Sequence, residues 1–333
     1  MIIRLFRSNL PSVYVLLLIY TLLLRGLFLW HPIFETPDES AFLGSYITRW
    51  IQDSHISPLA LQITDILLIY IEAILLNFIL TANKIFTSKS FVPAMIFITL
   101  SSLFGEWIEA SAQTVAQLFL LISMMSLFSI TGKETTRDGI FFTSVFLSIG
   151  SLFYFPVALF LIVILIGVLF RSLSFADFML IIIGFVLPYY FIGIGLYYMD
   201  SLGNYMYFLR SHFYINPVPG IDISWPQEIM LVYFFALVIC GYMLLQRDRE
   251  FKIVKHRRLV LIVLAYFILS ALAGPFIAGS KLLYIQCAVL PGTIFVSKIF
   301  NNEKLRFYHH TLFLVLFLGA ILFELDYLKI VRW

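Results

Sequence analysis

Apolar stretches of fifteen or more residues, separated by short polar gaps, follow one another along the whole chain. A helix that crosses a bilayer core needs about 20 apolar residues, and short or tilted helices widen that range. Breaks at charged residues, proline and glycine give eleven such segments: 11–30, 59–81, 91–105, 112–131, 139–153, 156–170, 176–198, 227–246, 259–278, 282–299 and 311–325. The pattern predicts an all-α, polytopic integral membrane protein with about eleven transmembrane helices, built as one domain over residues 1–333.

The stretch at 139–170 has two interpretations. Pro156 interrupts it, and a proline inside a helix removes a hydrogen bond and kinks or ends the helix. The stretch is therefore either two short helices or one long kinked helix. A single helix would place the basic run at 247–258 on the opposite side of the membrane, so the charge pattern favours two.

Lys and Arg residues are sorted between alternate gaps. With the N-terminus inside, sixteen of the twenty-two fall on the inner side and five on the outer side, while Arg25 lies within the first helix. Cytoplasmic loops of multi-pass proteins carry an excess of Lys and Arg. The sorting predicts a cytoplasmic N-terminus, and it places the two longest polar gaps, 31–58 and 199–226, on the outer face.

The composition agrees with a membrane domain, because 61% of the residues are hydrophobic and 12% are charged, whereas about 25% are charged in a soluble domain. The net charge of +3 follows from the excess of cations in the inner gaps, so it does not indicate a nucleic-acid partner. The basic run 247–258 is predicted to touch anionic membrane lipids or, as the alternative, to bind a membrane-protein partner. The two cysteines lie in apolar segments and imply no disulfide framework.

The outer gap after the first helix carries three carboxylates in five residues, within the sequence HPIFETPDESAF at 31–42. Beside a membrane, loss of water can bring a carboxyl group towards the proton affinity that a catalytic acid or base needs. Asp38 and Glu39 are therefore candidate catalytic residues. The alternative is that they cap a helix over residues 40–51.

The same region resembles the start of the GT-C glycosyltransferases, which are polytopic enzymes that use sugars linked to lipid phosphates. The resemblance rests on Arg25 late in the first helix and on Pro37-Asp38-Glu39 before an interfacial helix. It implies a GT-C-like helix arrangement, a polyprenyl-phosphate-linked sugar as substrate, and Asp38 or Glu39 as the base or as the contact to a divalent metal. Phe42 stands where Tyr or His is usual in that family.

Over most of its length the chain is similar to an uncharacterised family of multi-pass inner-membrane proteins from Bacteroidota. The similarity rests on the N-terminal sequence MIIRLFRSNLP, on Leu75-Leu76-Asn77 and on residues 116–127. It implies a location in the bacterial cytoplasmic membrane and no particular activity.

Three polar residues in the second apolar segment share one helical stripe: Gln62, Asp65 and Glu72. A carboxylate among lipid tails needs a partner or water. At 1.5 Å per residue, Arg25 and Asp65 lie roughly 8 and 10 Å from the outer ends of their helices, which predicts an ion pair between them. Glu72 lies deeper, and it is either part of a proton path or a neutral, hydrogen-bonded acid.

Arg210, His212 and Lys281 are basic residues near predicted outer helix ends. A lipid-linked phosphate at the outer leaflet would find its donors among them, and Arg210 can make bidentate contacts. The alternative is that these side chains reach lipid headgroups or pair with Asp200 and Asp222.

Three functions are compatible with these features. The first is a GT-C-like transferase that acts on a polyprenyl-phosphate-linked sugar. The second is a non-catalytic subunit of a multi-protein inner-membrane complex, and the third is a proton-coupled transporter built around Glu72. No Walker A, HExxH, GxSxG or CxxC motif is present, which argues against nucleotide-driven energy coupling by this chain alone.

Overall fold

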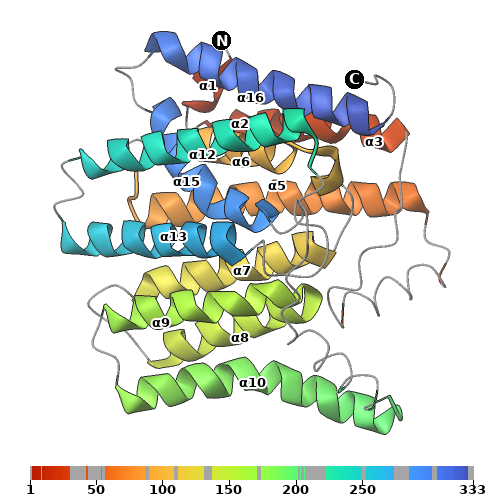
Figure 1. Cartoon of the computed structure of the whole chain (residues 1–333), viewed down its shortest axis with the longest axis vertical. Coiled ribbons are helices and arrows are strands. Elements are labelled where there is room, and N and C mark those ends of the chain that lie inside the picture. Colours follow the sequence, from red (N-terminus) through yellow and green to blue (C-terminus); the bar gives the residue numbers. More distant parts are fainter. Residues whose placement is uncertain are drawn as a thin grey trace.

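The structure is a computed structural model that describes residues 2–8, 10–30, 43, 54, 57–86, 90–108, 112–130, 137–170, 174–201, 203, 206, 223–248, 253–273, 285–301 and 306–328. These residues form helices, most of which run along a similar direction and pack side by side, with no strand among the described residues (Figure 1). The elements are α1 (Ile2–Phe6), α2 (Ser12–Arg25), α3 (Leu27–Trp30), α5 (Pro58–Ala82), α6 (Val92–Ser101), η1 (Gly105–Trp107), α7 (Ala112–Ile130), α8 (Arg137–Phe153), η2 (Phe155–Phe160), α9 (Leu161–Leu169), α10 (Phe175–Tyr198), α12 (Trp225–Gln246), α13 (Val254–Ala273), η5 (Gln286–Ala288), α15 (Val289–Asn301) and α16 (Arg306–Tyr327).

The prediction of an all-helical protein with apolar, membrane-type helices is confirmed for the described residues. Each of the eleven apolar segments overlaps a described helix. Within the described ranges, five helices are long and apolar enough to cross a membrane: α5, α7, α10, α12 and the part of α16 at Tyr308–Tyr327. The apolar helices Ser12–Arg25, Val92–Ser101 and Phe155–Leu169 are shorter, so eleven crossings remain a prediction.

The stretch at 139–170 forms helix α8 and, after a break, the consecutive elements η2 and α9. Helix α8 ends at Phe153, Tyr154 takes an extended conformation with φ −142° and ψ 102°, and Pro156 lies in the first turn of η2. Proline fits the first turn of a helix, where its missing N–H has no intrahelical partner in any case. Elements η2 and α9 then return alongside α8 (Figure 1).

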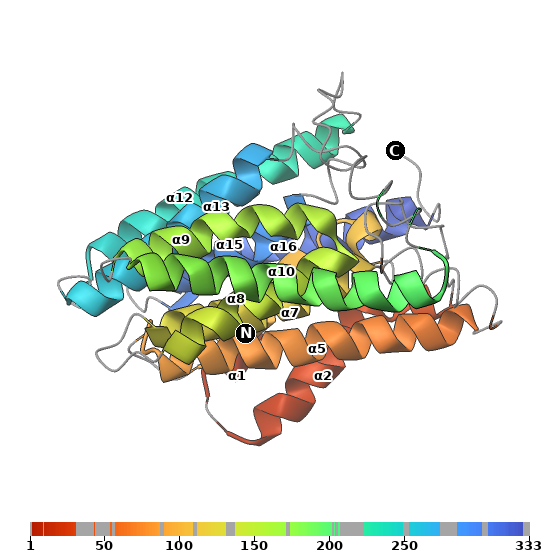
Figure 2. The ribbon, with the colours of Figure 1, turned by 90° about the horizontal axis from the view of Figure 1, so that it is seen from below.

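Helix α6 forms the centre of the bundle, and all ten of its residues are buried. A helix that is apolar on every face must be enclosed by other helices, and α6 contacts α2, α5, α15 and α16. The Tyr20 hydroxyl on α2 lies 2.7 Å from the Thr99 hydroxyl on α6. Figure 2 shows α12 and α13 together on one side of the bundle and α2 and α5 on the other.

Helices α12 and α15 approach so closely that their main chains are in contact. A Cβ atom placed on Gly241 of α12 would lie 2.0 Å from the carbonyl oxygen of Phe295 on α15. Glycine removes the side chain that would hold two helices apart, which is how apolar helices often pack within membranes. The register of α12 on α15 therefore depends on Gly241.

Helix α10 lies at the edge of the bundle and packs on α8 (Figure 1). Ser148 of α8 donates a hydrogen bond of 2.6 Å to the Phe185 carbonyl of α10. The remaining faces of α10 expose large apolar side chains, which include Ile183, Val186, Tyr190, Phe191, Tyr197 and Tyr198. Soluble monomers rarely expose continuous apolar surface of this kind, so these faces are suited to contact with lipid.

The two ends of the bundle differ in their side chains. We name the end at which α3 finishes and α5 begins the Pro58 end. Exposed aromatic residues lie there, and they are Trp30, Tyr197, Tyr198 and Trp225. Trp and Tyr are enriched where a membrane meets water, so these residues mark a boundary of the apolar belt.

Candidate functional site

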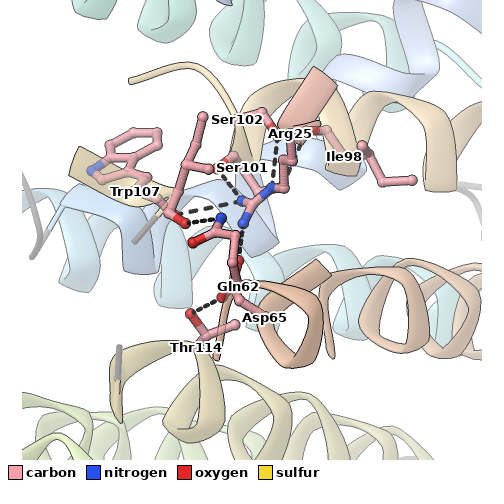
Figure 3. A network of polar contacts seen from close by, with 9 residues as sticks. Arg25, Gln62, Asp65, Ile98, Ser101, Ser102, Trp107 and Thr114 are labelled. Atoms are coloured by element: carbon pink, nitrogen blue, oxygen red, sulfur yellow. Dashed lines mark hydrogen bonds and ion pairs between the residues drawn. The ribbon is translucent and has the colours of Figure 1, made fainter. Parts of the chain in front are cut away.

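A buried charged network lies near the Pro58 end, and Arg25 is its centre (Figure 3). The Arg25 side chain is fully buried, and its Nη1 donates to the Asp65 carboxylate. Its Nε donates to the Ser102 hydroxyl at 3.0 Å, and its Nη2 donates to the Ser101 carbonyl at 2.7 Å and to the Trp107 carbonyl at 3.5 Å. All three guanidinium nitrogens therefore have partners.

The end of α6 explains why Arg25 binds there. The last carbonyl groups of an α-helix have no partner within the helix and form the negative end of its dipole. Helix α6 ends at Ser101, and the Ser101 carbonyl accepts from Arg25. The guanidinium thus satisfies a carbonyl that would otherwise be unpaired inside an apolar bundle.

Asp65 is held from two sides. Thr114 in the first turns of α7 donates to the second Asp65 oxygen at 3.1 Å. One turn away on α5, the Gln62 amide donates to the Ile108 carbonyl at 3.1 Å. The Arg25 network, which we define as Arg25, Asp65, Ser101, Ser102, Trp107 and Thr114, therefore joins α2, α5, α6, η1 and α7.

The predicted contact between Arg25 and Asp65 is confirmed. The polar stripe of α5 is buried as well, since Gln62, Asp65 and Glu72 are each at most 3% exposed. The pair connects the two helices that flank residues 31–57, because α3 follows α2 directly and α5 begins at Pro58. Both attachment points of the predicted outer loop are therefore fixed relative to each other.

Glu72 has a different environment from Asp65. Its side chain is fully buried, and neither carboxyl oxygen has a hydrogen-bond partner within the described part of the chain. It experiences attraction from Arg25 and repulsion from Asp65, so it lies within electrostatic range of the network. The deep position predicted for Glu72 agrees with this burial, whereas the alternative of a hydrogen-bonded acid finds no partner among the described residues.

Glu324 is a third buried acid that the sequence interpretation missed. It lies one turn from the end of α16, it is 1% exposed, and it experiences attraction from Arg25. The contact of Tyr327 with Gly105 brings this part of α16 to η1. The signal was available, because Glu324 is a carboxylate inside the apolar segment 311–325, as Asp65 is in its own segment.

Two glutamines with unpartnered amides lie in the same half of the bundle. Both polar atoms of Gln117 on α7 and both of Gln286 on η5 are buried without a partner among the described residues. Gln113 lies one turn before Gln117, and its amide is 3.9 Å from the Cys287 sulfur, which places η5 against α7. Buried amides normally have partners, so these two glutamines are unusual features of this half of the bundle.

Asp38, Glu39, Arg210, His212 and Lys281 lie outside the described residues, as do most residues of the loops 31–58 and 199–226. Their catalytic and phosphate-binding roles remain predictions. Within the described residues, no group of three or more His, Cys, Asp or Glu side chains is arranged to hold a metal ion.

A scan of protein-family models and searches of curated proteins and of solved structures found no match to this chain. The resemblances to the GT-C glycosyltransferases and to the Bacteroidota inner-membrane family therefore remain predictions from the sequence.

Proposed function

We propose that this chain is a GT-C-like glycosyltransferase of a bacterial cytoplasmic membrane, which takes a sugar from a polyprenyl-phosphate carrier at the outer leaflet. Asp38 or Glu39 acts as the base or as the contact to a divalent metal. Arg210, His212 or Lys281 binds the phosphate of the carrier. The observation that carries the proposal is the buried Arg25 network at the Pro58 end.

The proposal places eleven crossings in the membrane, with the N-terminus in the cytoplasm. The described cations support this orientation. Apart from Arg25, each Lys or Arg whose side chain is described belongs to the end opposite Pro58: Arg4, Arg7, Lys84, Arg137, Arg247, Lys255, Arg257, Arg258 and Lys298. Cations accumulate on the cytoplasmic side of membrane proteins, so the Pro58 end is assigned to the outer side.

The Arg25 network supports a site in the segment between Trp30 and Pro58. Catalytic groups work best when the elements that carry them are held rigidly by packing and hydrogen bonds. The network fixes α2 to α5 and fixes both to α6 and α7. The segment with Asp38 and Glu39 therefore begins and ends on helices that cannot move independently.

The transfer can be measured in membranes from a host strain in which the gene is deleted and then restored. The membranes are incubated with a panel of radiolabelled undecaprenyl-phosphate hexoses and pentoses, and the label that leaves the lipid-phosphate fraction is counted. Loss of a general base lowers a rate by about 10²–10⁴-fold. We expect Asp38→Asn or Glu39→Gln to cause a loss of that size.

Glu228→Gln is the matched control, because Glu228 is an exposed carboxyl group in the first turn of α12, also at the Pro58 end. This variant should retain the wild-type rate. Equal transfer in the deleted and restored membranes, or wild-type rates in both the Asp38 and the Glu39 variant, would remove the basis of the proposal.

The unpartnered carboxyl group of Glu72 favours a second candidate function, proton-coupled transport. A buried ionisable residue in a membrane helix commonly marks a path for ions or protons. If the chain is a proton-coupled transporter, Glu72→Gln should abolish proton-driven substrate uptake by proteoliposomes. A pH gradient should still drive substrate uptake by the wild-type chain. Unchanged uptake by the variant would exclude it.

A further inference from the structure

Glu72 occupies the middle of α5. It lies fourteen residues after Pro58 and ten residues before Ala82, which at 1.5 Å per residue is roughly 21 and 15 Å from the two helix ends. Its side chain is fully buried, and the described residues offer no hydrogen bond to either carboxyl oxygen.

Few charged groups surround it. Helix α5 packs against α2, α3, α6 and α7. Elements α3, α6 and α7 contain no titratable side chain. The titratable residues on α5 and on α2 are Asp65, Tyr70 and Glu72 on α5, and Tyr14, Tyr20 and Arg25 on α2.

The tyrosines bring no charge to Glu72. The Tyr20 hydroxyl is bonded to Thr99, and the Tyr70 hydroxyl donates to the Tyr14 carbonyl. The electrostatic balance at Glu72 is therefore set by the attraction of Arg25 and the repulsion of Asp65.

Among the described residues, that balance leaves no cation for Glu72. A guanidinium keeps its positive charge in proteins, and Arg25 is already paired with Asp65. Glu324, which lies on α16, is also attracted to the Arg25 guanidinium. An ionised Glu72 would therefore add an uncompensated negative charge to an apolar interior, which is strongly unfavourable.

A proton neutralises this carboxyl group more readily than a metal ion does. Sodium, calcium or magnesium would need several oxygen ligands, and within the described residues no group is hydrogen-bonded to either Glu72 oxygen. A proton needs none of these ligands. We propose that Glu72 is an intramembrane proton-binding site whose charge balance is set by Arg25 and Asp65.

The distribution of polar side chains along α5 and α7 indicates the side from which protons exchange with Glu72. Towards the Pro58 end, α5 carries Asp65 and Gln62, and α7 presents Gln117 with an unpartnered amide. Towards the other end, the buried residues of α5 are apolar except for Asn77, and they are Ala73, Leu76, Ile79 and Leu80. Protons that reach Glu72 through the Pro58 end therefore pass more polar groups than protons that reach it through the other end.

The site can be tested without knowledge of the substrate, so its failure and the failure of the transferase are distinguishable. Infrared difference spectra of the full chain in lipid nanodiscs detect the carbonyl stretch of a protonated carboxyl group. We expect a band at neutral pH that Glu72→Gln lacks, that Glu228→Gln keeps, and that declines reversibly as the pH is raised. Absence of this band in the wild-type protein, or a band that does not respond to pH, would overturn the proposal.

Carbodiimide labelling provides a second measurement that needs no variant. Dicyclohexylcarbodiimide modifies protonated carboxyl groups in apolar surroundings, and mass spectrometry identifies the modified residue. We expect an adduct on Glu72 of the wild-type chain, with a yield that falls as the pH rises. Protection by sodium chloride at constant pH, relative to choline chloride, would replace the proton site by a sodium site and overturn the proposal.

Discussion

The pairing of Arg25 with Asp65 leads to a quantitative prediction. Arg25→Met removes the guanidinium, so Asp65 keeps only the Thr114 hydroxyl and the Ser101 carbonyl loses its donor. Asp65→Asn removes the negative charge and leaves a buried guanidinium with three neutral acceptors. Each single variant therefore isolates one buried charge.

The expected losses follow from that burial. Removal of one partner from a buried ion pair costs about 3–5 kcal/mol, mainly because the other charge stays buried and unpaired. The double variant Arg25→Met/Asp65→Asn has no unpaired charge, so it should lose less than the sum of the two single losses. Contacting residues in one network couple by about 0.5–3 kcal/mol, and we expect the upper half of that range because both side chains are at most 1% exposed.

Equilibrium unfolding by sodium dodecyl sulfate in mixed micelles gives the four free energies of unfolding. The pair of Lys298 with Asp248 is the control, because its side chains are 14% and 30% exposed. Exposed pairs contribute about 0.2–1 kcal/mol, so its cycle should give the smaller coupling. The coupling of Arg25 with Asp65 is refuted if the free energies of unfolding lost by the Arg25 and Asp65 single variants sum to the loss of the double variant within about 0.5 kcal/mol. Independent sites are additive in this way.

Three further predictions concern packing, a buried hydroxyl and orientation. Gly241→Ala should lower the free energy of unfolding by about 1–3 kcal/mol or more, because overpacking forces the α12 and α15 main chains apart. Gly195 has open space at its Cβ position, so Gly195→Ala should change the free energy of unfolding little in the same detergent titration. Tyr20→Phe should cost about 0.5–1.5 kcal/mol through loss of the buried hydrogen bond to α6, and an unchanged unfolding midpoint would contradict this. In a cysteine-free background, Asp38→Cys should react with an impermeant maleimide in intact spheroplasts and Lys84→Cys only after lysis, and the reverse result would invert the assigned orientation.

The helical organisation was predictable because exposed backbone groups and charged side chains are unfavourable in lipid. This cost applies to each short stretch of the chain separately. Interruptions by charge, proline and glycine are visible in the sequence, and each predicted segment overlaps a described helix. The contact of Arg25 with Asp65 was predictable for a related reason. Two opposite buried charges at the same depth on consecutive antiparallel helices have few other partners.

The remaining contacts of Arg25 were not predictable, because they depend on where α6 stops. The apolar segment was placed at 91–105, whereas the helix ends at Ser101. The early end frees the Ser101 carbonyl and turns the chain so that the Trp107 carbonyl also faces Arg25. Hydropathy cannot locate this end, since residues 102–105 carry no charge or proline.

Arg25 connects the transferase proposal and the proton site, but through different properties of the same side chain. Support of the segment that carries Asp38 and Glu39 depends on the planar guanidinium, because a single cationic point cannot reach Ser102, Ser101, Trp107 and Asp65 in one geometry. The charge balance at Glu72 depends only on the net charge near α5. A change at Arg25 that removes the network geometry but keeps the positive charge would therefore weaken the support of the outer segment and leave the proton on Glu72. Each proposal can thus fail without the other.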